Sequence, residues 1–343
     1  MMIKKSIKNH QLPLHLEYLF KEAGKKIFKI EHLHGIIEQH KFRITNPLSG
    51  KSMLIIGSNM YPDLSCAASI FTKHKWLTYK ILKKANILTP RTRLFKNPEN
   101  AVYIWKKRFH EKGIVMKPEN GGLGEKVFTG IKNIEDVKKY AKMILKNYKN
   151  GIIQRHKKGK DLRIQAIGGQ YFAACRRLPA HVYGNGKNSI KELILEKNKE
   201  KAKLHTKNQI IVDAETKKLL RKKNYTLNSI PHEGEKVRLK KASNIGLGGE
   251  PVDVTDILHS SFRTLIPTIS ELFSVKTFAI DCIVKDLRAP FNKENASIIE
   301  INAPCMWALN HFARGQKRNA ALAILDSFFE QESFDASSKK YLI

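Results

Sequence analysis

Ser297-Ile-Ile-Glu-Ile-Asn302 is a short apolar run in which two oxygen-bearing side chains stand two residues apart. The two-residue period of a β-strand places Glu300 and Asn302 on one face, and Ile299 and Ile301 on the other. A carboxylate and an amide oxygen that point the same way are donors that Mg²⁺ accepts. The stretch therefore predicts a strand with a metal-binding face.

A second predicted strand, Lys276 to Val284, supplies a third oxygen donor. It carries Asp281 among apolar residues, where a lone carboxylate is costly unless it is paired or bound to metal. We predict that Asp281, Glu300 and Asn302 bind Mg²⁺ together. The alternative is that Asp281 and Glu300 are ordinary acids at strand ends, each paired with one of the many Lys side chains.

A glycine-rich segment follows a third predicted strand, Gly113 to Pro118. Lys117 lies at the end of that strand, and the segment contains Gly121, Gly122 and Gly124. Such a loop can bring backbone N–H groups against phosphate oxygens, although a plain turn is the alternative. The sequence contains no Gly-x-x-x-x-Gly-Lys-Ser/Thr, which argues against a Walker P-loop.

Downstream of the glycine loop we expect a helix from Ile134 to Asn147, a strand at 152–154 and a hairpin. Its strands, Leu162 to Ile167 and Tyr171 to Cys175, meet at Gly168-Gly169.

The connector from Gln154 to Asp161 can contact adenine through backbone amides, with Asp161 accepting from ribose hydroxyls. A solvated loop in which Asp161 pairs with Lys160 or Arg163 is equally compatible with these residues. Arg163 and Arg177 are suited to a bidentate grip on carboxylate or phosphate.

Other segments have recognisable periodicities that indicate an α+β protein. We expect helices at 14–23, 75–84, 214–223 and 319–329, and strands at 52–56, 235–239 and 296–301. We expect a domain boundary near residue 70.

The composition is strongly basic. The 343 residues are 42% hydrophobic, enough for a substantial core, and carry a formal net charge of +32. This charge would attract nucleotides, acidic substrates, nucleic acid or a membrane surface, but it is spread in short Lys pairs rather than one block, and a general compositional bias explains it equally well.

The four cysteines are far apart and without metal-ligand spacing, which indicates reduced thiols in the cytoplasm. The chain shows no signal-peptide pattern and no run of 18 apolar residues, so neither export nor membrane insertion is expected.

The order of these motifs resembles the ATP-grasp ligases, and within them the ATP-grasp part of cyanophycin synthetase and of the bifunctional glutathione-synthesising ligase. The resemblance covers about Lys75 to Phe312. It rests on the following segments: Lys75 to Leu82, Val115-Met-Lys-Pro118, Asp161-Leu-Arg163, Arg176 to Gly186, Ser243-Asn244 through Gly248-Gly249, Asp253-Val-Thr-Asp256, Asp281 and Glu300-Ile-Asn-Ala303.

The resemblance implies an ATP-grasp fold, in which lobes at 71–158 and 159–335 grip ATP and residues 1–70 form a small N-terminal α/β domain. It also implies site roles for thirteen residues. Lys75 and Lys117 would hold the ATP phosphates, with Gly121, Gly122 and Gly124 in a mobile lid loop and Gln154 and Asp161 at the nucleoside. Asp281, Glu300 and Asn302 would bind Mg²⁺, as two ions that Mn²⁺ can replace. Arg163, Arg177 and Asn244 would face the acyl substrate or phosphate.

The implied reaction joins a carboxylate to an amine through an acyl phosphate and releases ADP and phosphate. It requires no Ser, Cys or His nucleophile, since positioning and charge neutralisation provide most of the catalysis. His181 is therefore expected to be a structural hydrogen-bonding residue. An amino acid, a dipeptide or a peptide end would be the substrate, and the chain could also form a homo-oligomer.

Departures from the family pattern leave the substrate open. Lys126 and Lys240 stand where Gly and Arg are usual, and the Asn-x-Asp-Pro-Arg-Arg-Gly stretch is reduced to Asn198-Lys-Glu-Lys-Ala-Lys203. A second, Mur-ligase-like active site is expected to be absent. The competing hypothesis is a catalytically silent protein of this fold that binds nucleic acid or another polyanion through its basic surface.

Overall fold

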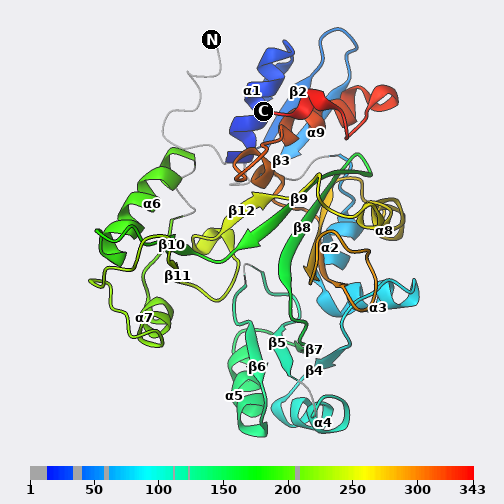
Figure 1. Cartoon of the computed structure of the whole chain (residues 1–343). Coiled ribbons are helices and arrows are strands. Elements are labelled where there is room, and N and C mark those ends of the chain that lie inside the picture. The colour runs from blue at the N-terminus through cyan, green and yellow to red at the C-terminus, as the bar shows by residue number, and fades with distance from the viewer. Residues whose placement is uncertain (1–13, 34–40, 58–61, 111–112, 123, 205–208) are drawn as a thin grey trace.

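The computed structural model describes residues 14–33, 41–57, 62–110, 113–122, 124–204 and 209–343 (Figure 1). Within these ranges the chain forms four sheets with helices packed around them. The expected α+β class is confirmed. None of the helices in the described ranges is both long and apolar enough to cross a membrane. All four cysteines are free thiols.

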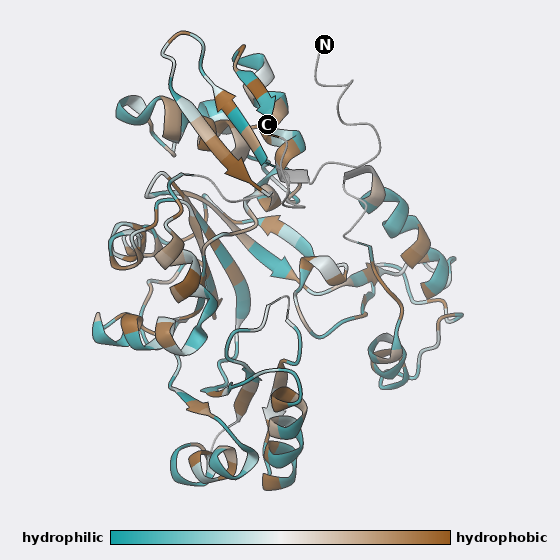
Figure 2. Ribbon diagram, turned by 180° about the vertical axis from the view of Figure 1, so that it is seen from behind, coloured by the Kyte–Doolittle hydropathy of each residue, from teal (hydrophilic) through white to brown (hydrophobic). Residues whose placement is uncertain are grey.

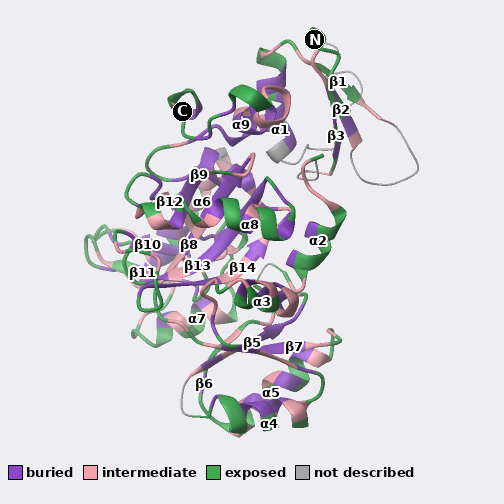
Figure 3. Ribbon diagram, turned by 90° about the vertical axis from the view of Figure 1, so that its right-hand side faces the viewer, coloured by how far each residue is buried: buried purple, intermediate pink, exposed green. Residues whose placement is uncertain are grey.

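The central sheet has five antiparallel strands in the order β12-β9-β8-β13-β14. These are β8 (Lys160–Ile167), β9 (Gln170–Leu178), β12 (Glu250–Asp253), β13 (Phe278–Val284) and β14 (Ala296–Asn302). The expected hairpin is confirmed as β8–β9, and both Gly168 and Gly169 have positive φ, as its tight turn requires. These strands are the most continuously buried part of the molecule (Figure 3).

The two faces of the central sheet are used differently. One face packs its apolar side chains, such as Ile164, Ile280 and Ile301, against α8 and the α2–α3 region. The other is covered by the C-terminal helix at one end, where Ala173 and Ala279 are buried, and carries charged residues at the other end. The covering helices are α2 (Cys66–Lys73), α3 (Lys75–Lys84), α8 (Leu265–Phe273) and α9 (Ala320–Phe329).

A smaller lobe is built on a four-stranded antiparallel sheet in the order β4-β7-β5-β6. Its elements are β4 (Thr92–Phe95), α4 (Pro98–Arg108), β5 (Ile114–Pro118), β6 (Phe128–Ile131), α5 (Ile134–Leu145) and β7 (Gly151–Arg155). Helices α4 and α5 bury Ile114, Met116 and Ile153 of one sheet face, and α5 shows separate hydrophobic and hydrophilic sides in Figure 2. The opposite face, with Lys117 and Gln154, is thereby left for contacts outside this lobe.

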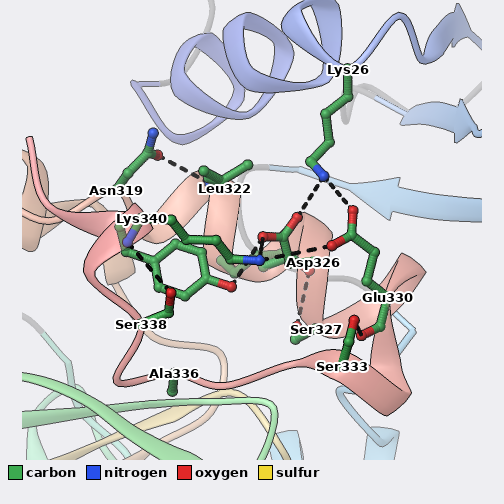
Figure 4. Close-up of polar contacts among 12 residues, drawn as sticks. Lys26, Asn319, Leu322, Asp326, Ser327, Glu330, Ser333, Ala336, Ser338 and Lys340 are labelled. Atoms are coloured by element: carbon green, nitrogen blue, oxygen red, sulfur yellow. Dashed lines mark hydrogen bonds and ion pairs between the residues drawn. The ribbon is translucent and has the colours of Figure 1, made fainter.

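The two ends of the described chain pack together beside the central sheet (Figure 1). Helix α1 (Leu14–Lys25) and the sheet of β1 (Lys29–His32), β2 (Lys41–Thr45) and β3 (Ser52–Ile56) share a core with α9. Asp326 of α9 is almost fully buried, and the amines of Lys26 and Lys340 lie 2.9 and 3.0 Å from its carboxylate oxygens (Figure 4). The Lys26 pair ties the N-terminal segment to α9, and the Lys340 pair holds the end of the C-terminal segment against the same helix.

A fourth unit projects from the central sheet next to β12 (Figure 1). It consists of β10 (His181–Tyr183), α6 (Ile190–Leu204), α7 (Ala214–Arg221) and β11 (Lys236–Arg238) around its own apolar core. The smaller lobe and this fourth unit each have their own apolar core, whereas the terminal segments share one with the central sheet. The boundaries at residues 70 and 158 stay predictions.

In β14, the expected alternation of side chains between the two faces of the sheet is interrupted once. Asp281 faces Glu300 across the ladder, but Cys282 faces Ile298, so Ile299 has no cross-strand partner. Ile298 and Ile301 enter the core, and Ile299 does not. The prediction that Ile299 lies with Ile301 on the apolar face was therefore wrong, because a β-bulge changes the phase there. The prediction for Glu300 and Asn302 is unaffected by the bulge.

Candidate active site

A row of charged side chains crosses three neighbouring strands of the central sheet. The register aligns Glu300 of β14 with Asp281 of β13, and Asp281 with Arg163 of β8. Directly opposite side chains point to the same face of an antiparallel sheet and lie close together. Backbone pairing thus places residues from widely separated parts of the sequence in one site.

Asp281 is at the centre of this row. Its Oδ1 accepts from Arg163 Nε at 2.8 Å, and its Oδ2 accepts from Arg163 Nη2 at 3.1 Å. Arg177 Nη2 lies 3.2 Å from the same Oδ2, and Asn302 Nδ2 also lies 3.2 Å away. Burial raises the pKa of Asp281, but Arg163 and Arg177 outweigh burial and bring it to about 2. The carboxylate is therefore ionised at neutral pH.

Asp161 extends the row through Arg177. Arg177 Nε donates to Asp161 Oδ1 at 2.7 Å. Burial nevertheless raises the pKa of Asp161, and repulsion by the nearby Asp281 carboxylate adds to the rise, against the opposing effect of Arg177. The proposed alternatives in which Asp161 pairs with Lys160 or Arg163 are wrong in detail, since its partner is Arg177 on the adjacent strand.

Two lysines lie on the side of the row nearest the smaller lobe. Lys75 Nζ is 3.1 Å from Glu300 Oε1 and also donates to the backbone carbonyl of Gly121. Lys117 is buried, and burial together with Lys75 lowers its pKa to about 8, against the opposing effect of Glu300 and Asp281. Within the described residues the Lys117 amine has no carboxylate at ion-pair distance. Lys117 is therefore a buried cation next to the charged row, and it is available to bind an anion.

The Lys75–Glu300 contact corresponds to the alternative considered for the acidic residues, in which each pairs with a lysine. For Glu300 that alternative describes the structure, whereas Asp281 pairs with arginines. The Lys75 contact leaves lone pairs on the Glu300 carboxylate. The Asp281 oxygens already receive four N–H contacts, two from Arg163 and one each from Arg177 and Asn302, so a metal ion at Asp281 would have to displace one of them.

The glycine segment lies over this end of the site. A Cβ on Gly121 would come within 2.8 Å of Pro118 Cβ, and Gly124 has a positive φ of 75° with the Asn244 side chain close by, 3.6 Å from where its Cβ would stand. The structure thus brings Lys75, Gly121, Gly124 and Asn244 together. Lys126, which stands where the family usually has Gly, also adopts a left-handed φ of 49°.

Among the described residues, Gln154 makes no contact with the charged row. Its Nε2 donates to Thr92 Oγ1 at 3.0 Å, and both side chains are buried. The register pairs Gln154 with Val115 and Ile152 with Lys117, so Gln154 and Lys117 share one face of the small sheet. Their side chains can border the same ligand without touching each other.

The structure adds a partly buried pair, His74 and Glu119, that the sequence did not indicate. Glu119 follows Lys117 and Pro118, is 6% exposed, and its Oε2 lies 2.8 Å from Nδ1 of His74. The backbone N–H of Lys75 donates to the carbonyl of Glu119 at 3.1 Å. His74 and Glu119 therefore connect the start of α3 to the strand end that precedes the glycine loop. The two residues are 45 positions apart, and no local sequence pattern indicates that they meet.

The predicted donors have the chemistry that Mg²⁺ prefers. Asp281, Glu300 and Asn302 present three oxygen-bearing groups on one face of two paired strands. In the described part of the chain no group of three or more His, Cys, Asp or Glu side chains gathers around a possible metal position. Two carboxylates and an amide leave coordination positions for phosphate and water, which is how Mg²⁺ is usually held.

Comparison with known proteins identifies a domain within the chain. Residues 72–217 match the model of the RimK-like ATP-grasp domain. This part of the chain is a RimK-like ATP-grasp domain. The chain is 29% identical over 272 residues to the glutathione biosynthesis bifunctional protein GshAB of Clostridium perfringens, covering 77% of this chain and 35% of that protein.

Two further similarities agree with this assignment. Cyanophycin synthetase of Trichormus variabilis is 31% identical over 225 residues, which cover 64% of this chain and 25% of that enzyme. The crystal structure of a bifunctional glutathione synthetase from Pasteurella multocida aligns with a TM-score of 0.70 at 23% identity, over 94% of this chain and 44% of that one. The ATP-grasp fold expected from the motifs is confirmed. The chain spans about a third or less of the length of these curated relatives.

Proposed function

We propose that this ATP-grasp protein is a carboxylate–amine ligase that uses ATP to form an amide bond and releases ADP and phosphate. The observation that carries the proposal is the row Glu300–Asp281–Arg163, which stands opposite the buried Lys117 and beneath the glycine loop. It combines cations for phosphate with oxygen donors for a metal, and it contains no nucleophile–base pair for another chemistry.

The reaction has two steps whose atoms balance. A substrate carboxylate oxygen attacks the γ-phosphorus of ATP, the bond to the β-phosphate oxygen breaks, and ADP leaves. An amine nitrogen then attacks the carbonyl carbon of the acyl phosphate, phosphate leaves with its bonding electrons, and the amine loses a proton. Each step needs negative charge to be held and neutralised rather than a side chain to become covalently bonded.

The chain's own residues divide this work. Lys75 and Lys117 hold the phosphates, and the backbone of Gly121, Gly122 and Gly124 closes over them as a lid. Gln154 and Asp161 border the nucleoside. Arg163, Arg177 and Asn244 bind the acyl group and the phosphate that leaves it, because guanidinium groups match planar carboxylate and phosphate oxygens.

Asp281, Glu300 and Asn302 would hold Mg²⁺, as two ions for which Mn²⁺ can substitute. When bound, the metal neutralises charge on the transferring phosphoryl group. Arg163 and Arg177 keep Asp281 ionised and oriented for that role. Lys75 lies 3.1 Å from Glu300 Oε1 and helps to fix the position of that carboxylate.

An amino acid, a dipeptide or a peptide end is the proposed substrate, and the net charge of +32 favours one rich in carboxylates. ADP release should be measured over pooled amino acids and dipeptides, with and without Mg²⁺. We expect Mg²⁺-dependent release that Glu300→Ala lowers at least about 100-fold, by analogy with the loss of one charge-stabilising group. Glu294→Ala, on the exposed turn before β14, is the matched control and should retain activity.

The competing function is polyanion binding without turnover. It predicts no ADP release with any acid and amine, together with nucleic-acid binding that weakens steeply as salt rises. Undiminished turnover in Glu300→Ala would instead refute the assignment of the site while leaving the ligase function in place.

A further inference from the structure

A cavity of about 240 Å³ lies between α6 and the edge strand β12, outside the charged row. Six charged side chains line it: Lys197, Glu200, Lys201, Glu250, Arg314 and Lys317. Its apolar wall includes Pro251 and Phe312. Ligand sites combine an apolar wall with a few placed polar groups in this way, and those for larger molecules have volumes of about 300–1,000 Å³. This cavity has the size for an amino acid or a short side-chain-bearing fragment.

The cavity is attached directly to the candidate active site. Pro251 of β12 is the backbone partner of Arg177 on β9, and Arg177 bonds Asp161 and Asp281. The backbone N–H of Arg314 donates to the carbonyl of Pro251 at 2.9 Å, so the segment that carries Arg314 is fixed to the same strand. A molecule in the cavity would lie one strand away from the residues proposed to hold the acyl group.

Cations outnumber acids around this space, with four Lys and Arg side chains and two Glu. Lys201 Nζ donates to the carbonyl of Gly249 at 2.8 Å, which occupies one of its three N–H donors and fixes the amine at the edge of the cavity. Lys197 Nζ donates to the backbone carbonyl of His181 at 2.9 Å and lies 3.6 Å from Glu250 Oε2. Within the described residues, Arg314 and Lys317 form no ion pair.

The surrounding charges also affect Lys201 itself. Burial and the neighbouring Lys197 lower the pKa of Lys201 to about 8, against a smaller opposing effect of Glu250. A partly buried ammonium beside another cation is stabilised when an anion binds next to it.

We infer that this cavity is the subsite for the acidic part of the substrate, and that Lys201 and Arg314 bind a carboxylate of an amino acid or peptide there. The methylene groups of the ligand lie against Pro251 and Phe312, and Glu250 faces its ammonium group. This inference rests on the proposed ligase function and names the class of substrate that the site takes.

Binding of acidic ligands can be tested apart from catalysis. Wild-type protein is titrated calorimetrically with a pool of aspartate, glutamate and the dipeptides built from them, and with the corresponding asparagine and glutamine pool. We expect heat of binding with the acidic pool only. Lys201→Met and Arg314→Gln should each weaken that binding at least about tenfold, which corresponds to one lost charged hydrogen bond. Lys199→Met, exposed on the same helix, is the matched control and should bind as the wild type does.

A second readout needs no variant and therefore does not depend on a variant folding. Amine-selective labelling followed by mass spectrometry should show that the acidic pool protects Lys201 but not Lys199. No binding by the wild type, equal binding by all variants, or no protection of Lys201 would overturn the subsite. Displacement by inorganic phosphate or an oligonucleotide as effective as the acidic pool would also overturn it, in favour of a general anion site.

Glu300→Ala separates this inference from the function on which it rests. If both are correct, that variant loses ADP release but binds the acidic pool normally. If the ligase proposal fails and the subsite holds, no protein releases ADP while the binding pattern is unchanged. If the subsite fails and the ligase proposal holds, Lys201→Met releases ADP at the wild-type rate at every concentration of the acidic pool.

Discussion

Arg177 bridges two carboxylates of the candidate active site, with Nη2 2.7 Å from Asp161 Oδ1 and 3.2 Å from Asp281 Oδ2. One guanidinium group thereby joins strands β8, β9 and β13 on the charged face of the central sheet. The proposal that Arg177 also contacts the substrate makes this bridge a connection between substrate and metal ligands.

Replacing Arg177 should impair both stability and turnover. Arg177→Met leaves Asp161 and Asp281 with less compensation for their burial, and loss of one partner of a buried ion pair costs about 3–5 kcal/mol. We expect a fall of about that size in the free energy of unfolding, measured by urea denaturation. Arg176→Met removes the neighbouring guanidinium, which is not part of this network, and should change it little. Equal effects of the two changes would contradict the bridge.

Replacing Lys117 should impair turnover without lowering stability. Burial lowers its pKa to about 8, which means that keeping this amine charged in the folded state costs stability. Lys117→Met should therefore leave the thermal midpoint unchanged or raise it, while ADP release falls at least about 100-fold because the phosphates lose a cation. Calorimetry and the ADP assay check the two parts. A large loss of stability would show that Lys117 has a structural role.

His181 predicts a pH dependence of stability. Burial lowers the pKa of His181 to about 4, while its Nδ1 lies 2.8 Å from the carbonyl of Pro179. Because the folded pKa lies below the unfolded value of about 6.5, the stabilisation is complete above pH 6.5 and is lost as pH falls toward 4. Urea midpoints at pH 7, 5.5 and 4.5 should decline more steeply for the wild type than for His181→Gln.

The low pKa of Asp281 cannot produce that decline. Its folded value of about 2 lies below the ordinary 3.8, so its contribution is lost only as pH falls through the window from 3.8 to 2. Parallel midpoint curves for the wild type and His181→Gln between pH 7 and 4.5 would exclude His181 as the cause.

The His74–Glu119 pair predicts a modest structural effect. Glu119→Gln keeps the shape of the side chain but removes the charge that faces His74 at 2.8 Å. We expect the free energy of unfolding to fall by about 1–2 kcal/mol, which is typical of a partly buried hydrogen bond to a charged group. Glu294→Gln, at an exposed position, serves as the comparison. No difference between the two variants in urea would show that the pair contributes nothing.

Periodicity predicted the parts of the fold that depend on neighbouring residues. The helix at 75–84 and the strand at 52–56 have the expected bounds, and Gly168-Gly169 forms the expected turn, because local sequence determines each of them. The shared face of Glu300 and Asn302 follows from the same rule. The bulge at Ile299 could not be foreseen, since it depends on the register with β13.

Contacts between distant segments required the structure. Arg177 pairs with Asp161 because β8 and β9 are aligned in one particular register, and a shift by one residue would bring other side chains together. Lys240 was known only as a departure from the family pattern, whereas the structure shows it buried against Asp213 at the start of α7. The cavity beside β12 likewise combines α6 with residues more than 100 positions later in the chain.

The most direct test of the proposed ligase function is the ratio of ADP formed to amide bonds formed, measured by mass spectrometry on the same reaction. With Mg²⁺, ATP and the substrate pool, we predict one ADP per amide bond in the wild type and in Glu294→Ala, and neither product in Glu300→Ala. ADP without any amide product, or amide formation that survives loss of Glu300, would contradict the account.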